Sequence, residues 1–571
     1  MTTNNKEINI GRIKITFRVV AVLLGLLQAW AARNNFDNNG VPYLDIGDAY
    51  FRGDWNSAIN SYWSPLYSWL LGFTIFILKP SAYWETSCLY LVNFLIYLFA
   101  LACFEFFLNK LIRYHQIISA KSSTNGDYIA LPDWGLIIIG YSLFLFSSLK
   151  MITLRFQSPD MCVAAFVYLI SGIILYIYTG VNKWFIYFLL GLALGFGYLA
   201  KAAMFPLTFV FLGITLFSIQ PFQRSISKIL IVLIAFLLVS APFIIAISKS
   251  KEHLTFGEVW KLQYAACVNG LPDENWDEVQ SLKNGIPLHP VRKIFSKPTI
   301  NEFGTPFTEV TYPLEHDPYY WFEGVNFHFD LKQQIKTFLI NARLYYLIFL
   351  NYQAELILAC LILFCMGQRG WFLFKDISKY LIIIIPAIAA MFMYSLLVVQ
   401  ERYLGAFFLL LWMGLFSAAR LHNSQESKRF ISCIMLAVLT VLMVRISATA
   451  TRSIHKITYD LMNGEEAHLG WQIASGLKQL GIQPKDKVAL IADPYGNYWA
   501  RLAKVKVVAD IAEGDEHEFW AVNPNVKSKV INAFAKTGAK VIVTNGIPTY
   551  ASTTGWQMIR NTDRYVYFLQ K

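Results

Sequence analysis

Long apolar stretches separated by short polar connectors make up most of the chain. Eleven of these stretches come close to the roughly 20 residues that a helix needs to cross a bilayer. A further apolar stretch, residues 65–78, is short and begins with a proline. The pattern predicts a mainly α fold, a polytopic membrane bundle of about 11 to 13 transmembrane helices. The expected spans are residues 16–33, 86–108, 134–149, 160–179, 184–200, 202–218, 228–247, 343–366, 378–398, 402–419 and 430–449.

The positions of lysine and arginine decide how the stretch at 65–78 is interpreted. If it crosses the membrane, the basic connectors that follow, such as those with Lys110, Arg113, Arg224 and Arg420, all lie outside. If it is re-entrant or interfacial, they are cytoplasmic, as the positive-inside rule prefers. We therefore expect eleven crossings, with thirteen as the alternative, a cytoplasmic N-terminus that acts as an uncleaved signal anchor and an extracytoplasmic C-terminus.

After the last expected span the pattern changes to that of a small soluble α/β domain. We therefore divide the chain into a transmembrane domain, residues 1–451, and a C-terminal domain, residues 452–571. The C-terminal domain has no glycine-rich phosphate-binding fingerprint, which favours a docking or shielding role. Two of its stretches have helical periodicity and four are strand-like: residues 464–481 and 525–537, then residues 487–492, 505–511, 540–544 and 565–569.

Composition supports a membrane protein and excludes other classes. Of the 571 residues, 56% are hydrophobic and 15% are charged, and the mean hydropathy is +0.43, whereas soluble proteins carry about 25% charged residues. The net charge of +12 would suit nucleic acid, but the basic residues lie mainly in connectors between spans, so we expect no nucleic-acid partner. The seven cysteines have no metal-finger spacing and indicate no disulfide framework.

With this topology four polar segments lie on the outer side: the loop at 34–64, the short loop at 150–160, the long segment at 248–335 and the C-terminal domain. The first is rich in carboxylates. Acidic side chains at the edge of a bilayer are costly unless they are solvated, paired or used, and a carboxylate can act as general base on a hydroxyl. For two of the candidates, Asp48 and Asp54, solvation or helix capping is an equal or better explanation. The candidates are Asp37, Asp45, Asp48 and Asp54.

Charged residues also stand at other outer helix ends. Asp160 opens a span after a proline, where helix capping is the alternative to a role in a site. Lys201 emerges between two spans and either snorkels to the interface or binds an anionic headgroup or phosphate. Arg402 suits a phosphate because guanidinium groups bind it bidentately, unless Arg402 pairs with Glu401. Arg155, close to Asp160, is the third candidate for a phosphate.

Glycines, histidines and aromatic residues give further predictions about helix packing, metal binding and sugar contacts. Gly191 and Gly195 have the small-xxx-small spacing that predicts close helix packing. The histidines of segment 248–335 have no tight metal-ligand spacing, so we predict no required cofactor and no metal site, with a divalent metal as the alternative. Several aromatic residues could stack on a sugar, although interfacial anchoring is the commoner role. They are Trp63, Tyr67, Tyr319 and Trp321.

Taken together, these features resemble the GT-C superfamily of polyprenyl-phosphate-sugar-dependent glycosyltransferases. The branch that the chain resembles is that of the bacterial relatives of dolichyl-phosphate-mannose protein mannosyltransferases, which includes the lipid A aminoarabinose transferases and the Rgt-type galacturonosyltransferases. The resemblance covers residues 16–420 in layout and does not specify a sugar. It is sharpest at Tyr43-Leu-Asp-Ile-Gly, Trp63-Ser-Pro65-Leu-Tyr67, Ser158-Pro-Asp160 and Gly191 to Lys201.

The resemblance implies an inverting transfer at the outer face of the membrane. An aspartate of the first outer loop activates an acceptor hydroxyl, which attacks the anomeric carbon of a lipid-phosphate sugar, while basic residues hold the leaving phosphate. The family's aspartate stands about four residues before the tyrosine matched by Tyr43, where this chain has Asn39, so Asp37 or Asp45 would have to serve. Trp63 and Ser64 stand where the aminoarabinose branch has a Glu-Lys pair, which lowers the expectation of zinc.

We therefore predict an integral-membrane inverting glycosyltransferase, a hexosyl- or pentosyltransferase, in the plasma (inner) membrane. Its active site and C-terminal domain are expected to be extracytoplasmic. The expected partners are a polyprenyl-phosphate-linked sugar donor, a lipid, glycan or protein acceptor, and membrane lipids. One alternative is a lipid-linked sugar transporter or flippase, against which no inverted repeat is found. Another is a catalytically inactive GT-C-like binding protein, which Asn39 would explain.

Overall fold

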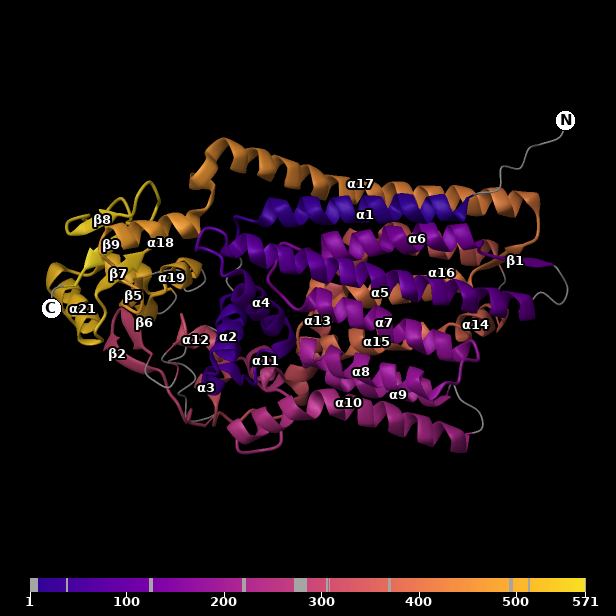
Figure 1. Cartoon of the computed structure of the whole chain (residues 1–571), viewed down its shortest axis with the longest axis horizontal. Helices are drawn as coiled ribbons and strands as arrows, with labels where there is room; N and C mark the ends of the chain where they lie inside the picture. Colours follow the sequence, from indigo (N-terminus) through magenta and orange to yellow (C-terminus); the bar gives the residue numbers. More distant parts are fainter. Residues whose placement is uncertain are drawn as a thin grey trace.

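The protein is a helical bundle with an α/β domain at one end (Figure 1). The predicted fold class, a mainly α membrane-type bundle with a small C-terminal α/β domain, is confirmed. The computed structural model describes residues 9–36, 40–122, 127–217, 222–271, 285–303, 307, 309–367, 371–491, 497–511 and 514–569.

Each of the eleven expected spans coincides with a helix. The long helices run side by side in Figure 1, and their packed faces share one apolar core. Among the described residues, seven helices are long and apolar enough to cross a membrane: α1 (Ile10–Ala32), α5 (Glu85–Ser122), α6 (Asp133–Phe146) continued by the π-helical η1 (Ser147–Ile152), α7 (Asp160–Tyr178), α10 (Phe222–Ser250), α13 (Leu331–Met366) and α17 (Gln425–Asn463). The other expected spans are α8 (Trp184–Ala200), α9 (Met204–Phe217), α15 (Leu381–Ser395) and α16 (Glu401–Ala418).

Glycines let two of these helices approach closely. A Cβ on Gly191 of α8 would meet the carbonyl oxygen of Val232 in α10, and a Cβ on Gly195 would lie 2.7 Å from the Val239 side chain. No larger residue fits at either position without moving the partner helix. The close packing predicted from the glycine spacing is therefore confirmed.

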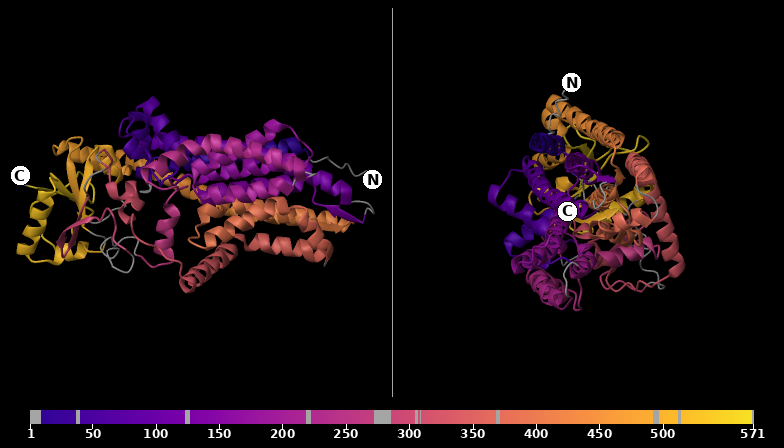
Figure 2. Two further views of the ribbon diagram at one scale, coloured as in Figure 1. Left: turned by 90° about the horizontal axis from the view of Figure 1, so that it is seen from below. Right: turned by 90° about the vertical axis from the view of Figure 1, so that its right-hand side faces the viewer.

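The apolar stretch at 65–78, for which a re-entrant or interfacial position is predicted, forms α4 (Pro65–Leu78). It crosses α2 (Gly40–Arg52) with the two backbones in contact, since a Cβ on Gly72 would lie 2.7 Å from the Gly47 backbone. In both Figure 1 and Figure 2 these helices lie at the end of the bundle that faces the α/β domain. The described part of the loop at 34–64, which is predicted to lie outside and is called the first outer segment below, thus forms with α4 a packed helical layer between the two parts of the protein.

Shorter elements complete both ends of the bundle. On the side of the α/β domain lie α3 (Trp55–Ala58), α11 (Val259–Cys267), α12 (Pro313–His316) and the 3-10 helix η3 (Pro318–Phe322). At the opposite end lie α14 (Trp371–Ser378) and a two-stranded antiparallel sheet of β1 (Tyr128–Ala130) and β4 (Arg420–His422).

A mixed sheet of order β2-β3-β6-β5-β7-β9-β8 forms the core of the α/β domain. The four predicted strand-like runs are confirmed as β5 (Lys487–Ile491), β6 (Lys506–Ile511), β7 (Val541–Thr544) and β9 (Tyr565–Phe568), with β8 (Trp556–Met558) at one edge. β5 pairs in parallel with β6 and β7. The other edge consists of β2 (Arg292–Ser296) and β3 (Thr299–Glu302), which come from the outer segment at 248–335. The sheet therefore takes strands from both sides of the predicted division at residue 451.

Successive residues of the central strand, β5, face opposite sides of the sheet, as the two-residue period of a strand requires, and each side is covered by an apolar layer. Val488 and Leu490 share one layer with Trp321 of the outer segment, whereas Ala489 and Ile491 belong to the other. The outer segment is thereby part of the hydrophobic core of the domain. The first layer contains α18 (Leu469–Gln479) and α19 (Tyr498–Ala503), and the second contains α20 (Glu516–Ala521) and α21 (Pro524–Lys536).

A carboxylate is buried where the outer segment joins the sheet. Asp510 of β6 lies opposite Asn301 of β3, and the Tyr312 hydroxyl donates a hydrogen bond to Asp510 Oδ2 at 2.6 Å. Burial raises the pKa of Asp510 to about 7, against the opposing effect of hydrogen bonds from Tyr312 and Asn301.

We expect Gly72→Ala to destabilise the protein, because the added methyl group would overlap the α2 backbone. Overpacking of this kind costs about 1–3 kcal/mol. Gly213→Ala in α9 is the matched control, since nothing lies within 4 Å of the place that its added methyl group would occupy. Thermal unfolding of both variants in detergent measures the difference, and equal midpoints would contradict the proposed contact.

We expect Asp510→Asn to remove a pH dependence of stability. With a folded pKa of about 7 and an unfolded pKa of about 4, the folded chain holds a proton that the unfolded chain has lost. The contribution of Asp510 to stability is therefore present below about pH 4 and is lost as the pH rises towards 7. Between pH 5 and pH 8 the wild type should lose this contribution to its stability, whereas the variant should not. The difference in unfolding midpoint, variant minus wild type, should therefore be larger at pH 8 than at pH 5. Parallel plots of unfolding midpoint against pH would show this to be wrong.

Candidate functional site

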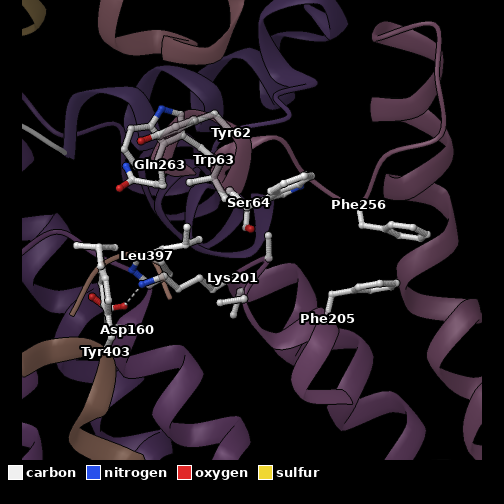
Figure 3. A pocket seen from close by; sticks show the side chains of 18 of the residues that line it. Tyr62, Trp63, Ser64, Asp160, Lys201, Phe205, Phe256, Gln263, Leu397 and Tyr403 are labelled. Carbon is white, nitrogen blue, oxygen red and sulfur yellow. Dashed lines mark hydrogen bonds and ion pairs between the residues drawn. The ribbon is translucent and has the colours of Figure 1, made fainter. Parts of the chain in front are cut away.

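A cavity of about 670 Å³ lies where several helices end beside the first outer segment. Its walls come from parts of the chain that are far apart in sequence, including the loop around Trp63, the ends of α7, α8, α15 and α16, and the segment at 254–263. Figure 3 shows charged and aromatic side chains from these elements turned towards one space. A site assembled in this way depends on the whole bundle.

Asp160 lies between two cations at the polar end of the cavity. Its side chain is 3% exposed, with Lys201 Nζ 2.7 Å from Oδ1 and Arg402 Nε 3.5 Å from Oδ2. Ser158 Oγ donates a hydrogen bond to Oδ2 at 3.0 Å. Lys201 Nζ also lies 3.4 Å from the centre of the Tyr403 ring, a cation–π contact. Two cations thus face one carboxylate, and this end of the cavity is suited to an anionic ligand.

The three charged groups meet because each stands at a helix end. Asp160 is the first residue of α7, Lys201 follows the last residue of α8, and Arg402 is the second residue of α16. Apolar residues fill the interior of all three helices, so a charged side chain is tolerated only at the ends. The Asp160 carboxylate therefore contacts Lys201 and Arg402 and does not cap the helix.

The other end of the cavity is apolar and open. The rings of Phe205 and Phe256 are stacked with centroids 4.1 Å apart, and Figure 3 shows them facing each other away from Asp160. Leu254 is 74% exposed and Trp260 is 46% exposed, so the rim on this side is itself apolar. The cavity is therefore amphipathic. Its other apolar lining includes Pro206, Met393, Leu397 and Val398.

The first outer segment contributes an aromatic wall. Trp63, a predicted sugar contact, lines the cavity together with Tyr43, whose ring meets it edge-on at 4.9 Å. Burial, with a smaller effect of the Asp160 charge, holds the pKa of Tyr43 well above its usual value. The Tyr43 hydroxyl therefore keeps its proton at neutral pH and can donate a hydrogen bond.

Asp45 and Asp48, two of the predicted catalytic residues, lie in a second charge cluster outside this cavity. Arg501 of α19 binds both, with Nη1 2.7 Å from Asp45 Oδ1 and Nη2 2.9 Å from Asp48 Oδ2. Its Nε lies 2.8 Å from Glu85 Oε1. Burial raises the pKa of Asp45, although the Arg501 charge opposes this. These carboxylates join the first outer segment to the C-terminal domain, and a catalytic role for them stays a prediction.

The remaining predicted site residues that the structure describes are not part of the cavity lining. Asp37 lies outside the described residues. Arg155 is exposed, and Tyr67 is fully buried, with its hydroxyl donating to Asn93 Oδ1 at 2.7 Å. Trp321 belongs to the core of the C-terminal domain. Tyr319 lies beside Lys251 and Lys261, with cation–π distances of 5.5 and 5.7 Å.

The sequence does not indicate the hydrogen bonds that hold the aromatic wall of the cavity to residues 315 and 316. Trp63 Nε1 donates to the carbonyl oxygen of Glu315 at 3.1 Å, and Asn60 Nδ2 donates to that of His316 at 2.7 Å. Arg501 was also missed, because an arginine in a short helix of a soluble domain carries no signal of its partners. Ser158 belongs to the Ser158-Pro-Asp160 motif, but its hydrogen bond to Asp160 depends on the turn before α7.

Among the described residues, no group of three or more His, Cys, Asp or Glu side chains is placed to hold a metal ion. The cavity wall there contains one carboxylate, Asp160, and its two oxygens already face Lys201 and Arg402. This donor set favours an anion over a cation. The prediction that no metal is required stays a prediction.

The fold can be compared with known proteins. No family model matches the chain, and no curated protein matches its sequence. Among solved structures, ArnT from Cupriavidus metallidurans in the apo state is similar, with a TM-score of 0.53 and 12% identity over 97% of this chain and 96% of that chain.

Two further solved structures are similar over most of this chain. ArnT from Cupriavidus metallidurans bound to undecaprenyl phosphate has a TM-score of 0.47 and 12% identity, covering 98% of each chain. The Archaeoglobus fulgidus oligosaccharyltransferase in complex with Zn and sulfate has a TM-score of 0.43 and 11% identity, covering 93% of this chain and 68% of that chain. At such identities, the likeness to apo ArnT shows the fold alone: a helical bundle with a small α/β domain, as predicted from the sequence.

Proposed function

We propose that this protein is an integral-membrane inverting glycosyltransferase, which moves a sugar from a polyprenyl-phosphate donor to an acceptor at the outer face of the plasma membrane. The observation that carries the proposal is the amphipathic cavity, with Lys201 and Arg402 around Asp160 at one end and an apolar, open wall at the other. A lipid-phosphate sugar has matching parts: an apolar chain, an anionic phosphate and a polar ring.

The two cations are the proposed partners of the donor phosphate. Arg402 offers a planar set of donors and Lys201 a point charge, a combination well suited to phosphate oxygens. The apolar wall with Phe205 and Phe256 would receive the first part of the lipid chain. The sugar would then lie against Trp63 and near the Tyr43 hydroxyl, since both line the same space.

Asp160 is the proposed partner of the acceptor hydroxyl. The hydroxyl oxygen forms a bond to the anomeric carbon as the bond from that carbon to the phosphate oxygen breaks, and the electron pair leaves with the phosphate. The hydroxyl proton passes to the carboxylate. A phosphate bound to Lys201 and Arg402 draws both cations from Asp160 and so frees it to accept the proton. Asp37 and Asp45, one of which would be the base according to the resemblance, are the other candidates for this role.

Direct binding tests the donor site. Each cation should contribute a charge-assisted hydrogen bond worth about 1.5–3 kcal/mol, so Lys201→Met and Arg402→Met should each weaken undecaprenyl phosphate binding roughly 10- to 100-fold. Arg155→Met is the matched control, because Arg155 is exposed and outside the cavity lining. Titration of the lipid into purified protein in nanodiscs measures all three. Equal affinities would refute the donor site.

Sugar transfer tests the activity. In membranes supplied with a radiolabelled polyprenyl-phosphate sugar pool, wild type should label an acceptor and Asp160→Asn should be slower by about 100-fold or more. Asp54→Asn is the control, because Asp54 accepts a hydrogen bond from the Ser57 N–H and lies outside the cavity lining. Asp37→Asn belongs in the same series, and a loss confined to that variant would give the role of base to Asp37.

The same series separates the alternatives. Undecaprenyl phosphate binding without transfer by the wild type would indicate an inactive GT-C-like binding protein. Movement of labelled lipid between the leaflets of proteoliposomes, again without transfer, would indicate a flippase.

A further inference from the structure

The short helix α19 of the C-terminal domain contacts the first outer segment at two places. The Tyr498 ring stacks on Phe36, with centroids 3.6 Å apart and planes 3° from parallel. One turn further along α19, Arg501 binds Asp45 and Asp48 of α2. One contact thus lies before residues 37–39 and the other follows them. The C-terminal domain therefore contacts both Phe36 and the two carboxylates of α2.

We infer that Arg501 is a positioning residue for transfer: by holding α2 through Asp45 and Asp48, it sets the place of Tyr43 in the cavity wall. The C-terminal domain then contributes to transfer by positioning α2, in addition to shielding the site. The inference rests on the proposed function and adds to it the domain on which that function depends.

The geometry of α2 supports this role. Asp45 and Asp48 are three residues apart and lie on one face of the helix, towards α19. Tyr43 lies in the cavity wall and meets Tyr67 of α4 edge-on at 5.1 Å. A rotation of α2 that released the carboxylates from Arg501 would also carry Tyr43 away from Asp160.

A second connection reaches Trp63, which lies beside Tyr43 in the same aromatic wall of the cavity. The Thr311 N–H donates to Asp45 Oδ2 at 2.7 Å, and the next residue, Tyr312, donates to Asp510 in the sheet. Four residues after Thr311, the carbonyl oxygen of Glu315 holds Trp63. Asp45 thus connects the α/β domain to both aromatic residues of the wall.

An arginine is needed at this position for two reasons. Its planar group presents separate nitrogens to Asp45, Asp48 and Glu85 at 2.7–2.9 Å, which a lysine ammonium cannot match in direction. Arg501 is 7% exposed and Asp45 is 6% exposed, so their charges are poorly screened by water. Without the guanidinium, the buried Asp45 carboxylate would lose its counter-charge beside Asp48 and Glu85, and we expect α2 to shift.

The proposed donor site uses other elements. Lys201 and Arg402 stand at the ends of α8 and α16, and the contacts of Arg501 are on α2 and α5. Loss of Arg501 should therefore slow transfer while lipid phosphate still binds. A residue that served stability alone would affect both properties together.

The experiment compares Arg501→Gln, Arg501→Lys and Arg560→Gln in the full-length protein. Arg560 is the matched control, because it lies in the same domain and contacts Trp471 and Gln472. We expect Arg501→Gln to keep undecaprenyl phosphate affinity within about twofold and to lower the single-turnover transfer rate by about tenfold or more. Arg501→Lys should restore part of the rate, and Arg560→Gln should match the wild type.

Hydrogen exchange over residues 40–52 tests the same inference without transfer. We expect faster exchange in this segment in Arg501→Gln, with exchange at the ends of α8 and α16 unchanged. If wild type shows no transfer, the proposed function fails, and the exchange result still decides whether Arg501 holds α2. Unchanged exchange, a wild-type transfer rate in Arg501→Gln, or a parallel loss of binding and transfer would each overturn the inference.

Discussion

A charge buried at the end of a membrane bundle needs a counter-charge, and this constraint determines how the end of the bundle beside the α/β domain is assembled. Asp160 obtains its counter-charges from Lys201 and Arg402, which brings the ends of three spans together. Asp45 and Asp48 obtain theirs from Arg501, which joins the first outer segment to the C-terminal domain. The first cluster has a cation in excess and lines an open space. The second has carboxylates in excess and is closed by packing.

Much of the fold could be predicted because the lipid environment makes hydropathy a direct signal of a spanning helix. The strands β5, β6, β7 and β9 were also visible as short β-branched runs in a polar tail. The strands β2 and β3 were not, because β3 pairs with β6 from a distant part of the chain. Nothing local to residues 292–302 indicates which sheet edge they would join.

The site could be predicted where the free-energy cost of placing a charge in the membrane leaves few positions for charged residues. Charged residues at the ends of apolar spans are few, so Asp160, Lys201 and Arg402 could be proposed together and the structure brings them together. Arg155 was predicted to bind phosphate and Tyr67 to contact a sugar, but Arg155 is exposed outside the cavity lining and Tyr67 is fully buried. The direction of a side chain from a turn or a helix is set by packing, which the sequence pattern does not specify.

The contact between Asp45 and Arg501 spans 456 residues, and it has a consequence for biogenesis. The ribosome delivers the acidic first loop early, whereas α19 is synthesised after α17, the helix that packs beside α1 in Figure 1. During this interval Asp45 and Asp48 lack the Arg501 guanidinium that they bind in the complete protein. The contact that holds α2 to the C-terminal domain therefore cannot form before α19 has been synthesised, so a chain truncated before α19 lacks it.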